Sequence, residues 1–254
     1  MLYLAYGRFP TLGVSNISNV MSREEQEKYT HLVVPKRKSE FLGSRLAVKH
    51  LIRACCVECK ELEFAQIQIR NEKSGAPFVE LDGIGRLPGR ISLSHSNGHV
   101  LTGYSPHAIR FGVDLERIEA RSREFCVDYF TDTELGLVER AVLGDRDLVT
   151  TVIWSAKEAV LKATLIGLGV DTRSIEINRF SDMNSNCNWR QLEIRSPGFK
   201  IPSPQVIWRR DGNFVLTICL LDCPDPILTF ISIDQAVAIS CGVNSCKTGD
   251  SLNP

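Results

Sequence analysis

The sequence lacks the features that would place this protein in a membrane, on nucleic acid or outside the cell. No apolar run approaches the ~20 residues that a helix needs to span a bilayer, and the opening MLYLAYGRFP lacks the charged-then-apolar order of a signal peptide. The 30 lysines and arginines balance 30 aspartates and glutamates, so no overall positive field favours nucleic acid or anionic lipid. We therefore expect a cytoplasmic protein that binds neither nucleic acid nor a membrane.

Two kinds of site are also disfavoured by missing patterns. The chain has nine cysteines, and without a secretion signal these are expected to be reduced thiols. Cys56 and Cys59 form a C-x-x-C group, but the paired spacing of a structural zinc site is missing. A Ser-His-Asp hydrolase is disfavoured because no G-x-S-x-G nucleophile elbow is present.

The pattern of predicted elements repeats along the chain, as strand, helices and strands, and then strand, helices and strands again. A long helix is expected over 36–57 and another over 146–165, because apolar residues recur there near the 3.6-residue period. This order predicts an α+β fold of two tandem, pseudo-symmetric halves, with no sequence identity between them. We place the halves at 1–108 and 109–238, followed by a flexible tail at 239–254.

Two carboxylates lie two residues apart in FGVDLERIE, which is expected to form a strand. Side chains alternate along a strand, so Asp114 and Glu116 share one face while Phe111, Val113 and Leu115 take the other. Two acids on one face repel, and Mg²⁺ with oxygen ligands would neutralise them. The alternative is an exposed polar strand edge with Arg117 as the counter-ion.

A second charged pair lies on the helix that contains WSAKEAVLKA. Glu158 and Lys162 are four residues apart, so they lie one above the other on the helix. Glu158 shares its side of the helix with apolar residues, and a core-facing glutamate must be paired, protonated or metal-bound. It is therefore either a metal ligand or general base, with Lys162 as a phosphate contact, or half of an internal Glu158–Lys162 ion pair.

Positive and hydroxyl groups that suit phosphate occur in the first half. In SLSHS, Ser94 and His95 end a strand just before the tight turn Asn97-Gly98. A single histidine in such a place is more often structural. The helix at 36–57 carries a basic face, which would either bind a polyphosphate or simply be solvated; its members are Lys36, Arg37, Lys38, Arg45 and Lys49.

Taken in order, SLSHS, GVDLE and WSAKEAVLKA resemble the motifs of the 4′-phosphopantetheinyl transferases, specifically the longer, monomeric type that acts on carrier proteins. The resemblance implies a pseudo-dimer with the active site in the cleft between its halves. It also implies Mg²⁺-dependent transfer of phosphopantetheine from coenzyme A to a serine of an acyl or peptidyl carrier protein, with release of 3′,5′-ADP.

Roles for individual residues follow from the resemblance. It implies Asp114, Glu116 and Glu158 as magnesium ligands, with Glu158 also deprotonating the carrier serine. Lys162 would contact the pyrophosphate. Coenzyme A phosphates would be held by Arg37, Arg45, Ser94, His95 and Lys162. The family often has G-K-P where this chain has Gly75-Ala76-Pro77, so Lys73 is a candidate replacement for the missing lysine.

Two other classes of function use the same residues. A Mg²⁺-dependent phosphoesterase would use water in place of the carrier serine. A non-catalytic protein that binds coenzyme A or a carrier would keep the fold without the reaction, but the intact acids and Lys162 disfavour this reading.

Overall fold

The computed structural model describes residues 1–9, 17–107, 109–165, 170–180, 189–196, 204–221, 223 and 227–232. The expected flexible tail at 239–254 lies outside these ranges. No helix in the described ranges is long and apolar enough to cross a membrane.

Helices and strands alternate in the order expected for two α+β halves. The first half contains β1 (Leu2–Arg8), α1 (Ile17–Val20), α2 (Arg23–His31), α3 (Pro35–Cys55), β2 (Ile67–Asn71), β3 (Pro77–Leu81), β4 (Gly85–Arg86), β5 (Arg90–Ser96) and β6 (His99–Ser105). The second contains β7 (Arg110–Arg117), α4 (Arg123–Tyr129), α5 (Asp132–Arg140), α6 (Arg146–Thr164), β8 (Glu176–Phe180), β9 (Arg190–Arg195), β10 (Gln205–Asp211), β11 (Phe214–Leu221) and β12 (Leu228–Ser232).

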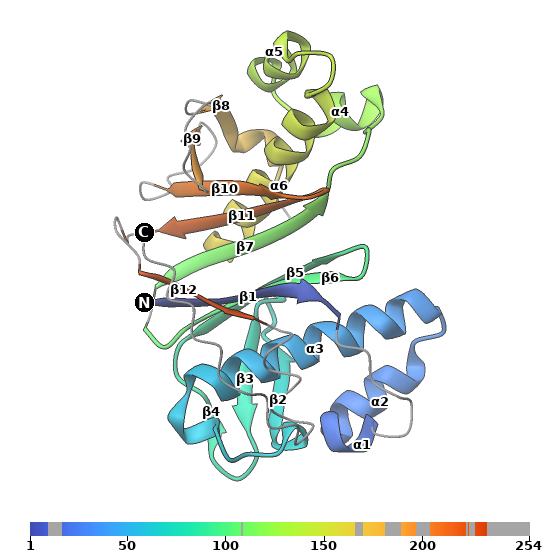
Figure 1. Ribbon diagram of the computed structural model, residues 1–254, viewed down its shortest axis with the longest axis vertical. Coiled ribbons are helices and arrows are strands. Elements are labelled where there is room, and N and C mark those ends of the chain that lie inside the picture. Colours follow the sequence, from blue (N-terminus) through green and yellow to red (C-terminus); the bar gives the residue numbers. More distant parts are fainter. Residues whose placement is uncertain are drawn as a thin grey trace, which may run out of the picture.

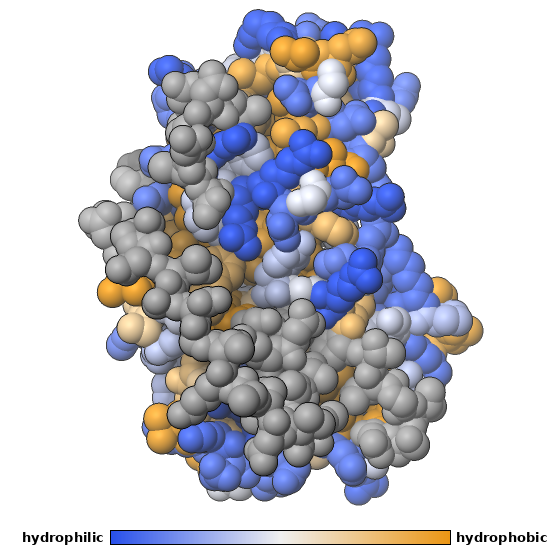
Figure 2. Space-filling view, viewed as in Figure 1, coloured by the Kyte–Doolittle hydropathy of each residue, from blue (hydrophilic) through white to orange (hydrophobic). Residues whose placement is uncertain are grey.

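The strands form three sheets, with orders β12-β1-β6-β5, β7-β11-β10-β9-β8 and β2-β3-β4. The two larger sheets lie side by side in the middle of the molecule (Figure 1), with α1–α3 and the small sheet on one side and α4–α6 on the other. This confirms the α+β class. In the view of Figure 2 the described surface is largely polar, with apolar side chains gathered at the α4–α5 end.

One strand crosses the predicted division of the chain. Strand β12 belongs by sequence to the second half, yet it pairs in parallel with β1 of the first half, with Leu2 opposite Leu228 and Tyr6 opposite Ser232. The division at 109–238 is therefore wrong for this strand. The pairing with β12 supplies hydrogen-bond partners for the backbone groups on the outer edge of β1, which would otherwise be unpaired.

Strand β7 separates the two cores that position the site. Phe111, Val113 and Leu115 are buried and pack with leucines of β1 and β6 to form the core between the large sheets. The opposite face of β7 lies against α6, which is buried along most of its length. Asp114 therefore lies on the α6 side of the strand, as the alternation of FGVDLERIE predicts.

Candidate active site

Three serines of SLSHS join strand β5 to strand β7 of the other half. The backbone N–H of Val113 donates to Ser92 Oγ at 3.0 Å, and the N–H of Arg117 donates to Ser96 Oγ at 3.2 Å. Between them, Ser94 Oγ donates to Asp114 Oδ1 at 2.8 Å. Ser94 thus donates to a carboxylate, and its expected contact with a phosphate stays a prediction. The serines recur every second residue, and so they share one face of β5.

Asp114 is the centre of the charged cluster on β7. It is only 2% exposed, and its Oδ1 accepts a hydrogen bond from Lys162 Nζ at 2.7 Å in addition to the one from Ser94. Its other oxygen, Oδ2, is buried without a hydrogen-bond partner among the described residues. Lys162 pairs with Asp114 and also donates to the Val113 carbonyl at 3.2 Å, so the alternative Glu158–Lys162 ion pair is wrong.

Glu116 is held by two side chains from its own half. Trp154 Nε1 donates to Glu116 Oε1 at 3.2 Å, and an Arg121 nitrogen lies 3.1 Å from Oε2. Burial, and then the charge of Asp114, raise the pKa of Glu116 to about 7, although Arg121 opposes this. The counter-ion considered from the sequence was Arg117, whereas the structure places Arg121 there. Arg121 and Glu116 are five residues apart, and this spacing brings side chains together on neither a regular strand nor a regular helix. The sequence therefore did not indicate that the two residues pair.

Glu158 lies on α6 one turn before Lys162 and is partly buried. Burial raises its pKa, the charge of Asp114 raises it further, and Lys162 opposes both effects. A carboxylate whose pKa lies above its usual range accepts a proton more readily near neutral pH. This is one property that a general base needs, and the role of Glu158 as a base stays a prediction.

Asp114 is close enough to raise the pKa of Glu116 and of Glu158, but the structure does not present the three acids as a ready ligand set. Within the described residues, no group of three acidic, histidine or cysteine side chains is arranged to hold a metal ion. The Oδ2 atom of Asp114 is nevertheless buried without a hydrogen-bond partner among the described residues, and burial, followed by the charge of Asp114, raises the pKa of Glu116 and of Glu158. Buried oxygens with excess negative charge fit a hard divalent cation.

A cavity of about 550 Å³ lies next to this cluster, between the two halves. Its wall takes residues from α3, from the β2–β3 turn, from β5 and from the end of α6. It brings together five of the residues singled out from the sequence: Arg37, Arg45, His95, Glu158 and Lys162. Ser94, Asp114 and Glu116 are not among the residues that line it.

The basic face of α3 is smaller than the sequence implied. Lys49 is fully buried and pairs with Glu25, with 2.5 Å between Nζ and Oε2. It therefore cannot contribute to a solvated or ligand-binding face. Arg37 is exposed at the cavity, while Arg45 is mostly buried at the cavity wall.

The turn between β2 and β3 also reaches the cavity. Ser74, Gly75, Ala76 and Pro77 line the wall, but Lys73 does not. The replacement of the motif's lysine by Lys73 therefore stays a prediction. Asn71 also lines the cavity. Asn71 and Ser74 are polar residues at this end of it.

Comparison with known proteins finds a family model and several relatives that are similar to this chain. Residues 110–219 match the family model of the 4′-phosphopantetheinyl transferase superfamily. The chain is 29% identical over 69 residues to the holo-[acyl-carrier-protein] synthase of Petrotoga mobilis, covering 27% of this chain and 56% of that protein. It is 27% identical over 169 residues to the L-aminoadipate-semialdehyde dehydrogenase-phosphopantetheinyl transferase of Schizosaccharomyces pombe, covering 61% of this chain and 62% of that protein.

A phosphopantetheinyl transferase from a Thraustochytrium species is 29% identical over 163 residues, which are 59% of this chain and 54% of that protein. The matches thus span between 54% and 62% of the lengths of these relatives. The family model covers Asp114, Glu116, Glu158 and Lys162, the charged cluster described above. This chain is therefore similar to the 4′-phosphopantetheinyl transferase superfamily over residues 110–219.

Proposed function

We propose that this protein transfers the 4′-phosphopantetheine group of coenzyme A to a serine of an acyl or peptidyl carrier protein, releasing 3′,5′-ADP. The observation that carries the proposal is the position of Glu158 and Lys162. They come from α6 and line a cavity that Arg37, Arg45 and His95 from the first half also line. A carboxylate and several basic side chains thus border one space of about 550 Å³.

Glu158 acts as the base in this proposal. The carrier serine gives its proton to the Glu158 carboxylate, directly or through a water, while its oxygen attacks the phosphorus that carries pantetheine. The bond from that phosphorus to the bridging oxygen breaks, and this oxygen leaves with 3′,5′-ADP. Positioning and charge neutralisation dominate the catalysis of phosphoryl transfer, so the cations on the wall matter as much as the base.

Lys162 and the α3 arginines supply the positive charge that remains on the protein. Lys162 is anchored to Asp114 and is 29% exposed, so its ammonium group is fixed on one side and accessible on the other. Arg37, Arg45 and His95 bind phosphate groups farther from the reacting atoms. Both halves of one chain supply the site, which supports a monomeric enzyme.

Mg²⁺ would be held by Asp114, Glu116 and Glu158. When bound, it would neutralise the charge that develops on the pyrophosphate oxygens. Asp114 is buried, and among the described residues its Oδ2 has no hydrogen-bond partner, which supports a cation at this oxygen. Ser94 and Lys162 fix the other oxygen and so orient this carboxylate.

The test follows the consumption of coenzyme A with Mg²⁺ present, with and without an apo carrier protein. The proposal requires consumption only when a carrier with a free serine is present, with one 3′,5′-ADP formed per carrier modified. Consumption without a carrier would favour the alternative of a Mg²⁺-dependent phosphoesterase. No consumption with any carrier tested would favour a non-catalytic binding protein.

A further inference from the structure

Each half contains the same buried arrangement of a capping glutamate and a lysine. Glu25 closes a capping box with Ser22 at the start of α2, accepts from the Ile69 N–H of β2 at 3.1 Å and pairs with Lys49 of α3. In the second half, Glu134 closes a capping box with Thr131 at the start of α5, accepts from the Ile177 N–H of β8 at 2.8 Å and pairs with Lys157 of α6. Both glutamates and both lysines are at most 1% exposed.

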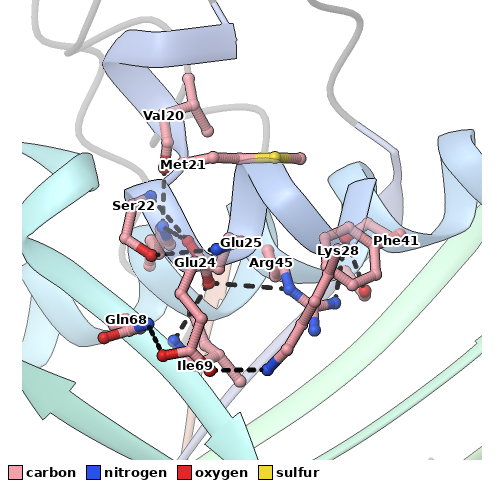
Figure 3. A network of polar contacts seen from close by, with 12 residues as sticks. Val20, Met21, Ser22, Glu24, Glu25, Lys28, Phe41, Arg45, Gln68 and Ile69 are labelled. Carbon is pink, nitrogen blue, oxygen red and sulfur yellow. Dashed lines mark hydrogen bonds and ion pairs between the residues drawn. The ribbon is translucent and has the colours of Figure 1, made fainter. Parts of the chain in front are cut away.

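The two arrangements differ in one charged residue. In the first half, Arg45 Nε lies 3.6 Å from Glu25 Oε1, and Figure 3 shows the two side chains pointing toward one another. In the part of the chain that the structure describes, the only ion pair of Glu134 is the one with Lys157. The first network thus holds two cations for one carboxylate, whereas the second is balanced.

Arg45 is the cation that faces the cavity. Its side chain is 14% exposed, its guanidinium carbon lies 3.2 Å from the centre of the Phe41 ring, and it lines the cavity wall. Burial lowers the pKa of Arg45 to about 10 against the opposing charge of Glu25. Its Nε is buried and has no hydrogen-bond partner among the described groups. This cation is therefore only partly neutralised, on a wall that is open to an anion.

We propose that Glu25 is a positioning residue for ligand binding. It holds the Arg45 guanidinium at the cavity wall, and it thereby increases the affinity for the phosphate groups of coenzyme A. This inference rests on the proposed function and adds to it a residue that does not touch the cavity. Glu25 is suited to the task because a helix cap, a strand amide and a buried lysine fix it on three sides.

Two effects of Glu25 on an anion oppose one another. Its negative charge repels the anion, while its ion pair keeps the partly desolvated Arg45 against the wall. Without Glu25, Arg45 would regain hydration by moving toward solvent, and a ligand would have to order it again, which weakens binding. The positioning effect is the larger one, because Glu25 lies 3.6 Å from Arg45 but does not line the cavity that the anion would enter.

The experiment compares Glu25→Gln with its counterpart Glu134→Gln. Both substitutions keep a capping side chain and remove one buried charge, so both should lower the melting temperature by similar amounts. Calorimetric titration with coenzyme A should show roughly tenfold weaker binding to Glu25→Gln and binding within about twofold of wild type for Glu134→Gln. In transfer assays, Glu25→Gln should raise KM for coenzyme A with little change in kcat, as expected for a residue that affects binding alone.

A double-mutant cycle tests whether Glu25 acts through Arg45. In an Arg45→Ala background, Glu25→Gln should have almost no further effect on affinity. If wild type binds coenzyme A but Glu25→Gln binds as tightly or more tightly, or if its effect persists in the Arg45→Ala background, the inference is wrong and the proposed function stands. Wild-type protein that does not bind coenzyme A would overturn both.

A second variant covers the case in which Glu25→Gln does not fold. Glu25→Gln combined with Lys49→Met removes both buried charges together, which proteins tolerate better than the loss of one partner. It also leaves Arg45 without its anchor. The same roughly tenfold loss of affinity is expected for this variant, and unchanged affinity would overturn the inference.

Discussion

Gly112 of β7 lies directly against Ala159 of α6, so that a Cβ atom added to Gly112 would stand 2.1 Å from the Ala159 carbonyl oxygen. The backbone nitrogen of Ala163 would lie 2.6 Å from this added Cβ atom. The missing side chain allows α6 to approach β7 closely. Asp114 and Lys162 meet across this contact at 2.7 Å.

We therefore predict that Gly112→Ala moves α6 away from β7 and disrupts the Lys162–Asp114 pair. Overpacking of this kind costs about 1 to 3 kcal/mol of unfolding free energy, which denaturant titration can measure. The rate of phosphopantetheine transfer by Gly112→Ala should fall by more than the loss of folded protein explains. Gly144→Ala is the matched control, because nothing lies within 4 Å of a Cβ atom at Gly144; equal losses in both variants would contradict the account.

Lys162→Met should destabilise the protein most when Mg²⁺ is absent. The substitution removes the counter-ion of a carboxylate that is 2% exposed, and an unpaired buried charge typically costs about 3 to 5 kcal/mol. Because Mg²⁺ would supply positive charge at the same carboxylate, it should raise the melting temperature of Lys162→Met more than that of wild type. A magnesium-induced shift no larger than in wild type would argue against a metal at Asp114.

Acid should destabilise the fold through His50, a buried residue of α3 whose ring meets the Phe64 ring edge-on, with 4.5 Å between the ring centres. Burial, and then the charge of Arg53, lower the pKa of His50 from 6.5 to about 4. The unfolded chain therefore binds the proton more readily, so this contribution to stability is present above pH 6.5 and is lost as the pH falls toward 4. When fully present, the contribution of His50 to the unfolding free energy is about 3 kcal/mol.

His50→Gln removes this titration while keeping a side chain of similar size. The unfolding free energy of wild type should fall more steeply between pH 6.5 and 4 than that of His50→Gln. Parallel pH profiles for the two proteins would show that the buried imidazole does not titrate in this range.

Glu158→Gln should leave the fold intact and nearly abolish transfer. The amide cannot accept the serine proton, and loss of a general base typically lowers kcat by about 10² to 10⁴-fold. Glu40→Gln is the control, because Glu40 lines the same cavity from α3 but has no role in the proposed reaction. The two melting curves and the two kcat values together decide whether Glu158 acts in the chemistry or only in packing.

The sequence predicted the elements around the site because their signals are local. Alternation placed Asp114 on the face of β7 opposite Phe111 and Val113. The capping residue Ser22 and the apolar period of α3 located those helices. The short strand β12 was not found, because its pairing with β1 is a contact between opposite ends of the chain. No local pattern in five residues reports such a contact.

The partners of charged side chains were harder to predict. The pairing of Lys162 with Asp114 depends on how closely α6 approaches β7, which the spacing of Glu158 and Lys162 cannot show. The burial of Lys49 did have a signal, since Leu46 and Ile52 lie three residues to either side and both are buried. A lysine within an apolar helical stripe predicts a buried partner, here Glu25.

Intact mass measurement of an apo carrier shows whether Glu158 and Lys162 direct phosphopantetheine to a carrier serine. The carrier is incubated with this protein, coenzyme A and Mg²⁺, beside a carrier whose acceptor serine is replaced by alanine. The account predicts a mass increase of one phosphopantetheine group on the first carrier only, present with wild-type protein and almost absent with Glu158→Gln. Modification of the serine-free carrier, or equal modification by wild type and Glu158→Gln, would contradict it.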